Sequence, residues 1–199
     1  MNDLTNKQSG LLFGSYSADA LSLGVHWIYD TNELAQKHGR VSEYKAPGAD
    51  SYHPHKQAGD QGHVGDQSLC LLQFLVREKK WSPSGFMNDW LGMWPEYNDY
   101  IDGATKSTLA NLQNQADNTQ VGSDSVEIAG PARIAPLVCH LANSTEEEVV
   151  RASIEQTILT HRSPEAEESA TFFAKAGYRL MHGANLVDTL NETAPAWAL

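Results

Sequence analysis

The sequence predicts an all-α protein. Apolar residues recur at helical spacing along most of the 199-residue chain, and the alternating pattern typical of half-buried strands is scarce. Hydrophobic residues make up 41% of the chain and charged residues 20%, a composition that can bury a core and is not that of a disordered protein. No linker rich in Pro, Ser or Gly divides residues 1–199, so we expect a single helical domain of roughly eight helices.

The N-terminal third predicts two helices followed by a long loop. Residues 8–25 place apolar side chains on one face, and residues 31–39 predict a short helix with Thr31 as its cap and Gly39 as its stop. Residues 40–64 are rich in Gly, Pro, His and Asp, and we interpret them as a loop. Long loops in compact domains are often functional.

The middle of the chain predicts three more helices. Residues 66–78 carry an apolar stripe, the Ser82-Pro83 pair begins a helix that runs through Trp90 and Trp94, and residues 104–116 form the third. A polar loop follows at residues 118–125.

The C-terminal part predicts further helices with marked ends. Residues 126–142 are apolar but contain two prolines, which indicates an interrupted helix. Ser144 and Glu147 have the spacing of a capping box, and a last helix begins at Ser163 and ends at Gly183.

The charge pattern argues against a nucleic-acid partner. The formal net charge is −11, and the densest basic run is the segment 77–80, whereas binding to a nucleic-acid backbone depends on neutralising its phosphates. No apolar run approaches the ~20 residues of a membrane span, and the first ten residues lack the pattern of a signal peptide. We therefore expect a cytoplasmic protein that binds neither nucleic acid nor membrane.

Polar residues gather at helix junctions, and each group has two interpretations. Asp66, Gln67 and Ser68 begin a helix, where they cap the backbone or act as oxygen ligands for a hard cation such as Mg²⁺. Asp19 lies among small and apolar residues, where it accepts a structural hydrogen bond or faces a cleft.

Two other junctions are equally open. Gly122, Ser123 and Ser125 form a capped loop or donate hydrogen bonds to a diphosphate. His161 and Arg162 compensate a helix dipole or belong to a site. The sequence contains no His-Asp pair and none of the motifs HExxH, GxSxG and GxxxxGK[ST], so the simplest hydrolase and P-loop interpretations are excluded.

Four ordered segments resemble motifs of the ADP-ribosylglycohydrolase family: GSYSADALSLGVHW, GHVGDQSLCLL, GSDSVEIAGPARIAPL and THRSPEAEESA. The resemblance implies an orthogonal helical bundle with a two-magnesium site, which cleaves the N- or O-glycosidic bond between ADP-ribose and a protein side chain or small acceptor. The family's Thr-Asp-Asp-Thr motif corresponds here to Gly65, Asp66, Gln67 and Ser68. This reduced version looks closest to the J-crystallin-like branch.

Carried over by position, the resemblance implies a catalytic residue, metal ligands and substrate-binding residues. The catalytic residue is Asp66, the metal ligands are Asp66, Gln67 and Ser68, and the substrate-binding residues are Asp19, Gly122, Ser123, Ser125 and His161. We expect Asp66, Gln67 and Ser68 to face one cleft together with Asp19 and Ser123.

The chain departs from the family in one further respect. The family's C-terminal Asp-x-Asp-Asp-Thr motif is absent, so the sequence resembles the N-terminal portion of the fold with its C-terminal part missing. We therefore expect weak or absent Mg²⁺ binding, and self-association over uncovered apolar surface. Hydrolysis of an ADP-ribose bond when the full site is present is one function, and a catalytically silent ADP-ribose-binding or crystallin-like structural protein is the alternative.

Overall fold

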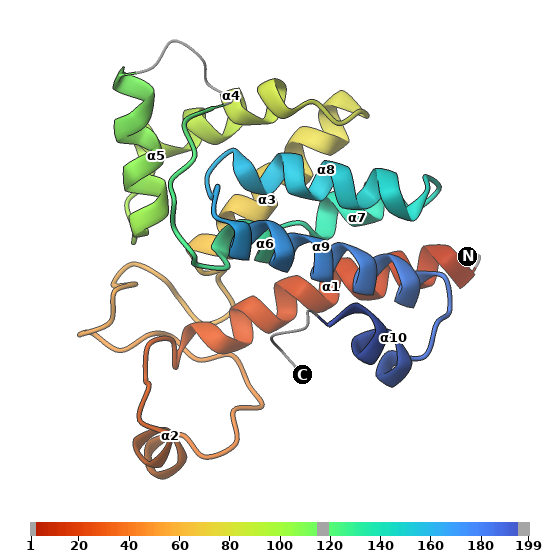
Figure 1. Ribbon diagram of the computed structural model, residues 1–199. Helices are drawn as coiled ribbons and strands as arrows, with labels where there is room; N and C mark the ends of the chain where they lie inside the picture. Colours follow the sequence, from red (N-terminus) through yellow and green to blue (C-terminus); the bar gives the residue numbers. More distant parts are fainter. Residues whose placement is uncertain (1–2, 115–119, 195–199) are drawn as a thin grey trace.

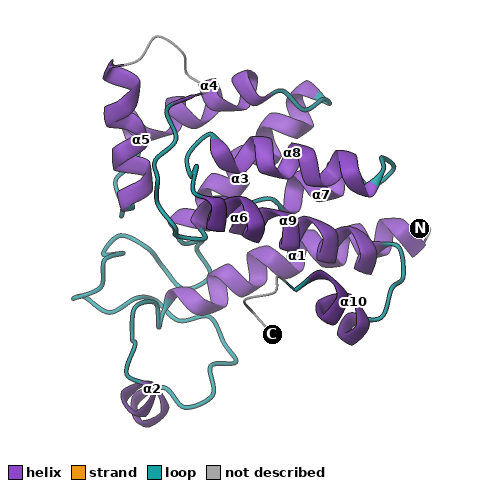
Figure 2. Ribbon diagram, in the orientation of Figure 1, coloured by secondary structure: helices purple, strands orange, loops and turns teal. Residues whose placement is uncertain are grey.

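The computed structural model describes residues 3–114 and 120–194, which form helices and connecting loops without a strand (Figures 1 and 2). In chain order the elements are α1 (Asp3–Leu23), α2 (Thr31–Lys37), α3 (His63–Glu78), α4 (Pro83–Met93), the 3-10 turn η1 (Trp94–Glu96), α5 (Gly103–Asn114), α6 (Ala129–Ala132), α7 (Ala135–His140), α8 (Glu146–Ile158), α9 (Pro164–Met181) and α10 (Leu186–Thr193). The predicted all-α class is confirmed. None of these helices has the length and apolarity needed to cross a bilayer.

The core has two parts that meet at α7 and α8. The first lies among α3, α4 and the second half of α5, and includes Leu137 of α7 and Ala152 of α8. The second lies between α1, α7, α8 and α9, and includes Val138 and Val149. Adjacent residues of α7 thus enter different clusters, which fixes this short helix at the centre of the bundle. The loop between α1 and α3, with α2, extends from the C-terminal end of α1 (Figure 1).

Several local predictions are confirmed. The apolar segment 126–142 is interrupted, since it forms α6 and α7 with Arg133 and Ile134 between them. Ser82 and Ser163 cap α4 and α9, because their hydroxyls accept the N–H groups of Gly85 and Ala166 at 3.2 and 3.1 Å.

Other predicted helix ends are wrong by a few residues. Asp30, rather than Thr31, caps α2, since its carboxylate accepts two backbone N–H groups. The capping box consists of Thr145 and Glu148, one residue after the predicted pair, because Thr145 takes the extended conformation. Helix α3 begins at His63, three residues early, so Asp66 lies in its first turn.

The short helix α10 was not predicted at all. Leu186, Val187 and Leu190 are all exposed on it, and only Thr189 is buried. These three residues share one face of the helix, so the sequence carries an apolar stripe that the interpretation overlooked, and the stripe faces solvent rather than the core. Asn185 accepts the N–H groups of Val187 and Asp188 and marks its start.

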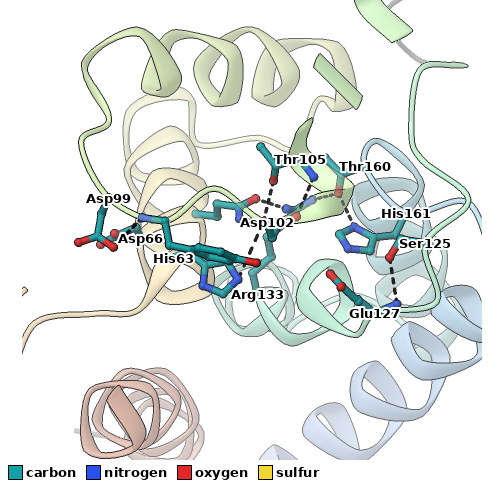
Figure 3. A network of polar contacts seen from close by, with 12 residues as sticks. His63, Asp66, Asp99, Asp102, Thr105, Ser125, Glu127, Arg133, Thr160 and His161 are labelled. Atoms are coloured by element: carbon teal, nitrogen blue, oxygen red, sulfur yellow. Dashed lines mark hydrogen bonds and ion pairs between the residues drawn. The ribbon is translucent and has the colours of Figure 1, made fainter. Parts of the chain in front are cut away.

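A buried arginine joins the elements that surround the site. Arg133 is completely buried, and its guanidinium donates to Gln156 Oε1 at 2.7 Å, to Gln67 Oε1 at 2.5 Å and to Thr160 Oγ1 at 2.6 Å (Figure 3). Burial lowers the pKa of Arg133 to about 10, which still leaves the group charged at neutral pH. Three acceptors from α3, α8 and the segment after α8 therefore converge on one cation.

Replacing Arg133 should test this role. Arg133→Met leaves three buried acceptors without their donor, and we expect the free energy of unfolding to fall by about 3 kcal/mol. Urea denaturation followed by circular dichroism measures the change. The control is Arg151→Met on the exposed side of α8, which should shift stability by less than about 0.5 kcal/mol. Equal effects of the two substitutions would contradict the assignment.

Candidate functional site

A cleft of about 580 Å³ lies where the C-terminal end of α1 meets the first turn of α3. Its polar wall comes from four separate segments of the chain and includes Asp19, His26, His63, Asp102 and Glu127. A second groove of about 530 Å³ is lined mainly by apolar side chains of α1, α7 and α9, and it shares Asp19 with the first. Asp19 therefore lies between the two depressions.

The position of Asp19 explains the glycine at position 65. The Asp19 carboxylate accepts the Gly62 N–H at 2.6 Å, just before α3 begins. A Cβ built on Gly65 would collide with Asp19 Oδ2 and would lie 2.6 Å from Gln61 Oε1. Burial raises the pKa of Asp19, although the hydrogen bond from Gly62 acts in the opposite direction. Both sequence interpretations of Asp19 thus hold, since it bonds to backbone and lines the cleft.

Asp66 is paired with a cation of this chain. Its Oδ2 accepts Lys56 Nζ at 2.5 Å and the Tyr97 hydroxyl at 2.8 Å. Neither partner was predicted, because Lys56 belongs to the long loop and Tyr97 follows η1. The carboxylate at the centre of the reduced motif is therefore already neutralised by an ammonium group.

Gln67 and Ser68 have partners inside the bundle. Gln67 is buried, and its carbonyl oxygen accepts Trp90 Nε1 at 2.8 Å as well as the Arg133 guanidinium. The Ser68 hydroxyl donates to the Arg133 carbonyl at 3.2 Å. Of the three residues expected to face one cleft with Asp19, Ser68 lines the apolar groove together with Asp19. Asp66 and Gln67 are not among the residues that line either depression, so the expectation is wrong for these two.

This set of donors does not fit a Mg²⁺ ion. Mg²⁺ requires near-octahedral oxygen coordination and anionic ligands. At Asp66 the anion has a lysine partner, and at Gln67 the amide oxygen already accepts two hydrogen bonds. We therefore assign no catalytic role to a magnesium ion at Asp66 or Gln67.

Asp102 is a site residue that the sequence interpretation missed. Its oxygens accept the Thr105 N–H at 2.7 Å and the Thr105 hydroxyl at 2.8 Å, just before and within the first turn of α5 (Figure 3). Burial by itself would raise the pKa of Asp102, but these hydrogen bonds outweigh it, and the pKa lies below its usual value. The segment Asp102-Gly103-Ala104-Thr105 looks like an ordinary helix cap, which concealed its position in the cleft wall.

His161 lies beside Asp102, as the prediction of a site residue requires. One ligand atom each from Asp102, Glu127 and His161 lies within 4.8 Å of the others. His161 Nδ1 is 2.8 Å from Thr160 Oγ1, while its buried Nε2 has no hydrogen-bond partner within the part of the chain described. Burial, followed by the nearby Arg133 charge, lowers the pKa of His161 to about 4, so the ring is neutral.

The loop predicted to hold phosphates lies outside the cleft wall. Ser123 bridges to the His161 segment, and both its N–H and its hydroxyl donate to the Thr160 carbonyl at 2.9 Å. A Cβ on Gly122 would collide with the Ile158 carbonyl. The Ser125 N–H donates to Ser123 Oγ at 3.3 Å. The expectation that Ser123 faces one cleft with Asp19 is wrong, because this strand-like contact with residues 160–162 turns its donors inward.

Three comparisons relate this chain to known proteins. A solved structure titled "ADP-ribosylglycohydrolase-related protein complex" superimposes with a TM-score of 0.77 at 22% identity, covering 96% of this chain and 61% of that one. Crystallin J1A from Tripedalia cystophora is 24% identical over 195 residues, covering 89% of this chain and 59% of its own length. The chain thus spans about three fifths of each relative. The family model for ADP-ribosylglycohydrolase matches residues 1–198, and the chain therefore belongs to the ADP-ribosylglycohydrolase family.

Proposed function

We propose that this protein hydrolyses an N- or O-glycosidic bond of an ADP-ribose-containing compound in the cleft lined by Asp19 and Asp102. The family relationship supports the reaction class, and the shared cleft wall supports the choice of residues. Both relatives are longer than this chain. The proposal therefore gives roles to Asp19 and Asp102 and does not describe a complete family site.

The observation that carries the proposal is that two of the carboxyl groups in the cleft wall, those of Asp19 and Asp102, have opposite protonation tendencies. Asp19 has a raised pKa and Asp102 a lowered one. Glycoside hydrolysis uses such a pair, because an acid must protonate the leaving atom while an ionised carboxylate stabilises the oxocarbenium-like state. We assign the acid to Asp19. We assign to Asp102 the ionised group that also takes the proton of the attacking water.

This assignment moves the catalytic role from Asp66 to Asp102. Asp66 was expected to act because it is the carboxylate that remains from the acidic motif. Its ion pair with Lys56 argues for a structural role. Of the predicted substrate-binding residues, Asp19 lines the cleft and His161 lies beside Asp102. That Gly122 and Ser125 contact the phosphates of the substrate remains a proposal.

The activity assay uses matched aspartate variants. Asp19→Asn and Asp102→Asn should each lower the release of free ADP-ribose from ADP-ribosylated protein or small acceptors by about 100-fold or more, because each removes a proton-transfer group. The control is Asp50→Asn in the exposed loop, which should leave the rate unchanged. Circular dichroism verifies folding. Full activity in Asp102→Asn would disprove the assignment.

A second function is favoured by a specific observation. The neutralised Asp66 and the similarity to Crystallin J1A suit a protein that binds ADP-ribose without cleaving it, or that serves a structural purpose. Calorimetry with ADP-ribose separates the two cases: binding without release of product from any ADP-ribosylated compound would select the non-catalytic function.

Magnesium titration should show the effect of Lys56. We expect the unmodified chain to lack micromolar Mg²⁺ affinity, since Asp66 already has a cationic partner and Gln67 supplies no charge. Lys56→Met removes the competing ammonium and should strengthen Mg²⁺ binding several-fold, whereas Lys80→Met in the exposed turn after α3 should not. Isothermal calorimetry measures both. Micromolar affinity in the unmodified protein that is lost in Asp66→Ala would overturn the expectation.

Self-association also stays a proposal. The apolar groove between α1 and α9 is open to solvent at Phe173, and Phe13 is 67% exposed on α1. Burying such surface against a second copy is favourable by roughly 25 cal/mol per Å². We expect light scattering to give a mass above that of one chain, and Phe13→Ser with Phe173→Ser to reduce it. A concentration-independent monomer would refute the proposal.

A further inference from the structure

We propose that His26, His53 and His63 form a binding site for a divalent transition metal of the Zn²⁺ class at the wall of the cleft. The three imidazoles come from the turn after α1, the long loop and the first residue of α3. One ring nitrogen from each lies within 4.8 Å of the other two. The mechanism proposed above does not use any of these rings, and the site is separate from Asp66.

The arrangement of the rings matches a metal centre. The ring centres form a nearly equilateral triangle with sides of 5.3, 5.8 and 6.0 Å, and the ring planes differ by only 8° to 23°. A Zn–N bond of about 2.1 Å, with roughly 1.2 Å from nitrogen to ring centre, places each ring centre about 3.3 Å from the ion. Around a tetrahedral ion such ring centres lie about 5.4 Å apart, close to the separations observed here.

Two of the nitrogens already have the separation of metal ligands. His26 Nδ1 and His53 Nε2 are 3.2 Å apart. Two nitrogens bound at about 2.1 Å to one tetrahedral ion lie about 3.4 Å apart. In the absence of metal, this contact is a hydrogen bond in which one ring donates to the other.

The third ring has a buried nitrogen that lacks a hydrogen-bond partner, and we assign this atom as the third ligand. His63 is 6% exposed, and its Nδ1 makes no hydrogen bond to any described part of the chain. Its other nitrogen, Nε2, lies 3.9 Å from Asp102 Oδ2. A buried polar atom without a partner is costly. An ion within the triangle would satisfy it while leaving Nε2 directed at the Asp102 carboxylate.

Asp99 determines the tautomer that binding requires. Its Oδ1 lies 2.7 Å from His53 Nδ1. When Nδ1 donates to this carboxylate, the lone pair of His53 is on Nε2, the atom that faces His26. Metal-bound histidines commonly donate their second N–H to a carboxylate, which fixes the ring and strengthens it as a ligand.

The surroundings favour the neutral form of His26 and His63 and cover part of the site. Burial, with the neighbouring histidines, lowers the pKa of His26 to about 4, and burial also lowers the pKa of His63. Neutral imidazole is the form that binds metal. Trp27 stacks on His26 with ring centres 3.7 Å apart, and its plane is within 21° of all three imidazoles. The indole therefore covers one face of the array.

The chemistry of the ligands selects the class of ion. Imidazole nitrogens suit Zn²⁺, Co²⁺, Ni²⁺ and Cu²⁺, whereas Mg²⁺ prefers oxygen ligands. Three histidines leave one coordination position of a tetrahedral ion free for water or another small ligand. Asp99 and Asp102 supply negative charge next to the ion without being ligands.

The test is a metal titration of the chelator-treated protein with Co²⁺ and Zn²⁺ alone. We expect one Co²⁺ per chain, a visible absorption band of a nitrogen-bound tetrahedral ion, and its displacement by Zn²⁺. His53→Gln and His63→Gln should weaken binding by about 100-fold, and Asp99→Asn by roughly 10-fold. The control His55→Gln, an exposed histidine in the same loop, should bind as the unmodified protein does.

Two results would overturn the proposal: no equimolar Co²⁺ or Zn²⁺ binding by the unmodified chain, or binding that is lost in His161→Gln but kept in His53→Gln. If the buried variants fail to fold, the half-buried His26→Gln serves instead. Zn²⁺ should raise the melting temperature of the unmodified protein but not that of His26→Gln. Because the readout is metal binding, failure here is distinguishable from absence of hydrolase activity.

Discussion

The site depends on the burial of one guanidinium group among neutral oxygens. Arg133 is completely buried, yet its hydrogen-bond acceptors are the amides of Gln67 and Gln156 and the hydroxyl of Thr160. Gln67 completes the network, because its amide nitrogen lies 3.5 Å from Asp102 Oδ2. The amide thereby links the cation to the anion of the cleft. A loss of this cation would change the packing of α3 and α8 and the electrostatics at Asp102 together.

Local patterns in the sequence were sufficient for most of the helices, for the interruption between α6 and α7, and for some of the helix ends. Caps such as Ser82 and Ser163 use interactions within a few residues, which a sequence displays directly. The errors occurred where two neighbouring residues could both cap, as at Thr145, or where a helix had no buried stripe, as in α10. Competition between adjacent candidates is decided by backbone conformation, which tertiary packing fixes.

The residues of the site were harder to predict from the sequence, because their partners also depend on tertiary packing. Asp19 and His161 were anticipated through family resemblance, and both lie at the cleft or beside its carboxylate. Asp102 was missed because a capping aspartate has many structural explanations. The histidines at 26, 53 and 63 were also not connected, since only the folding of the long loop onto the start of α3 brings them together. Which partner a polar side chain meets is a long-range property.

The close approach of Asp19 to Gly65 couples position 65 to two other positions of the chain. A side chain at position 65 would overlap the carboxylate of Asp19 and the amide of Gln61. A hydroxyl residue introduced there would push against the carboxylate that accepts the Gly62 N–H at the start of α3. The residue at position 65 and the conformations of Asp19 and Gln61 therefore form one steric unit, so a change at one of them is felt by the other two.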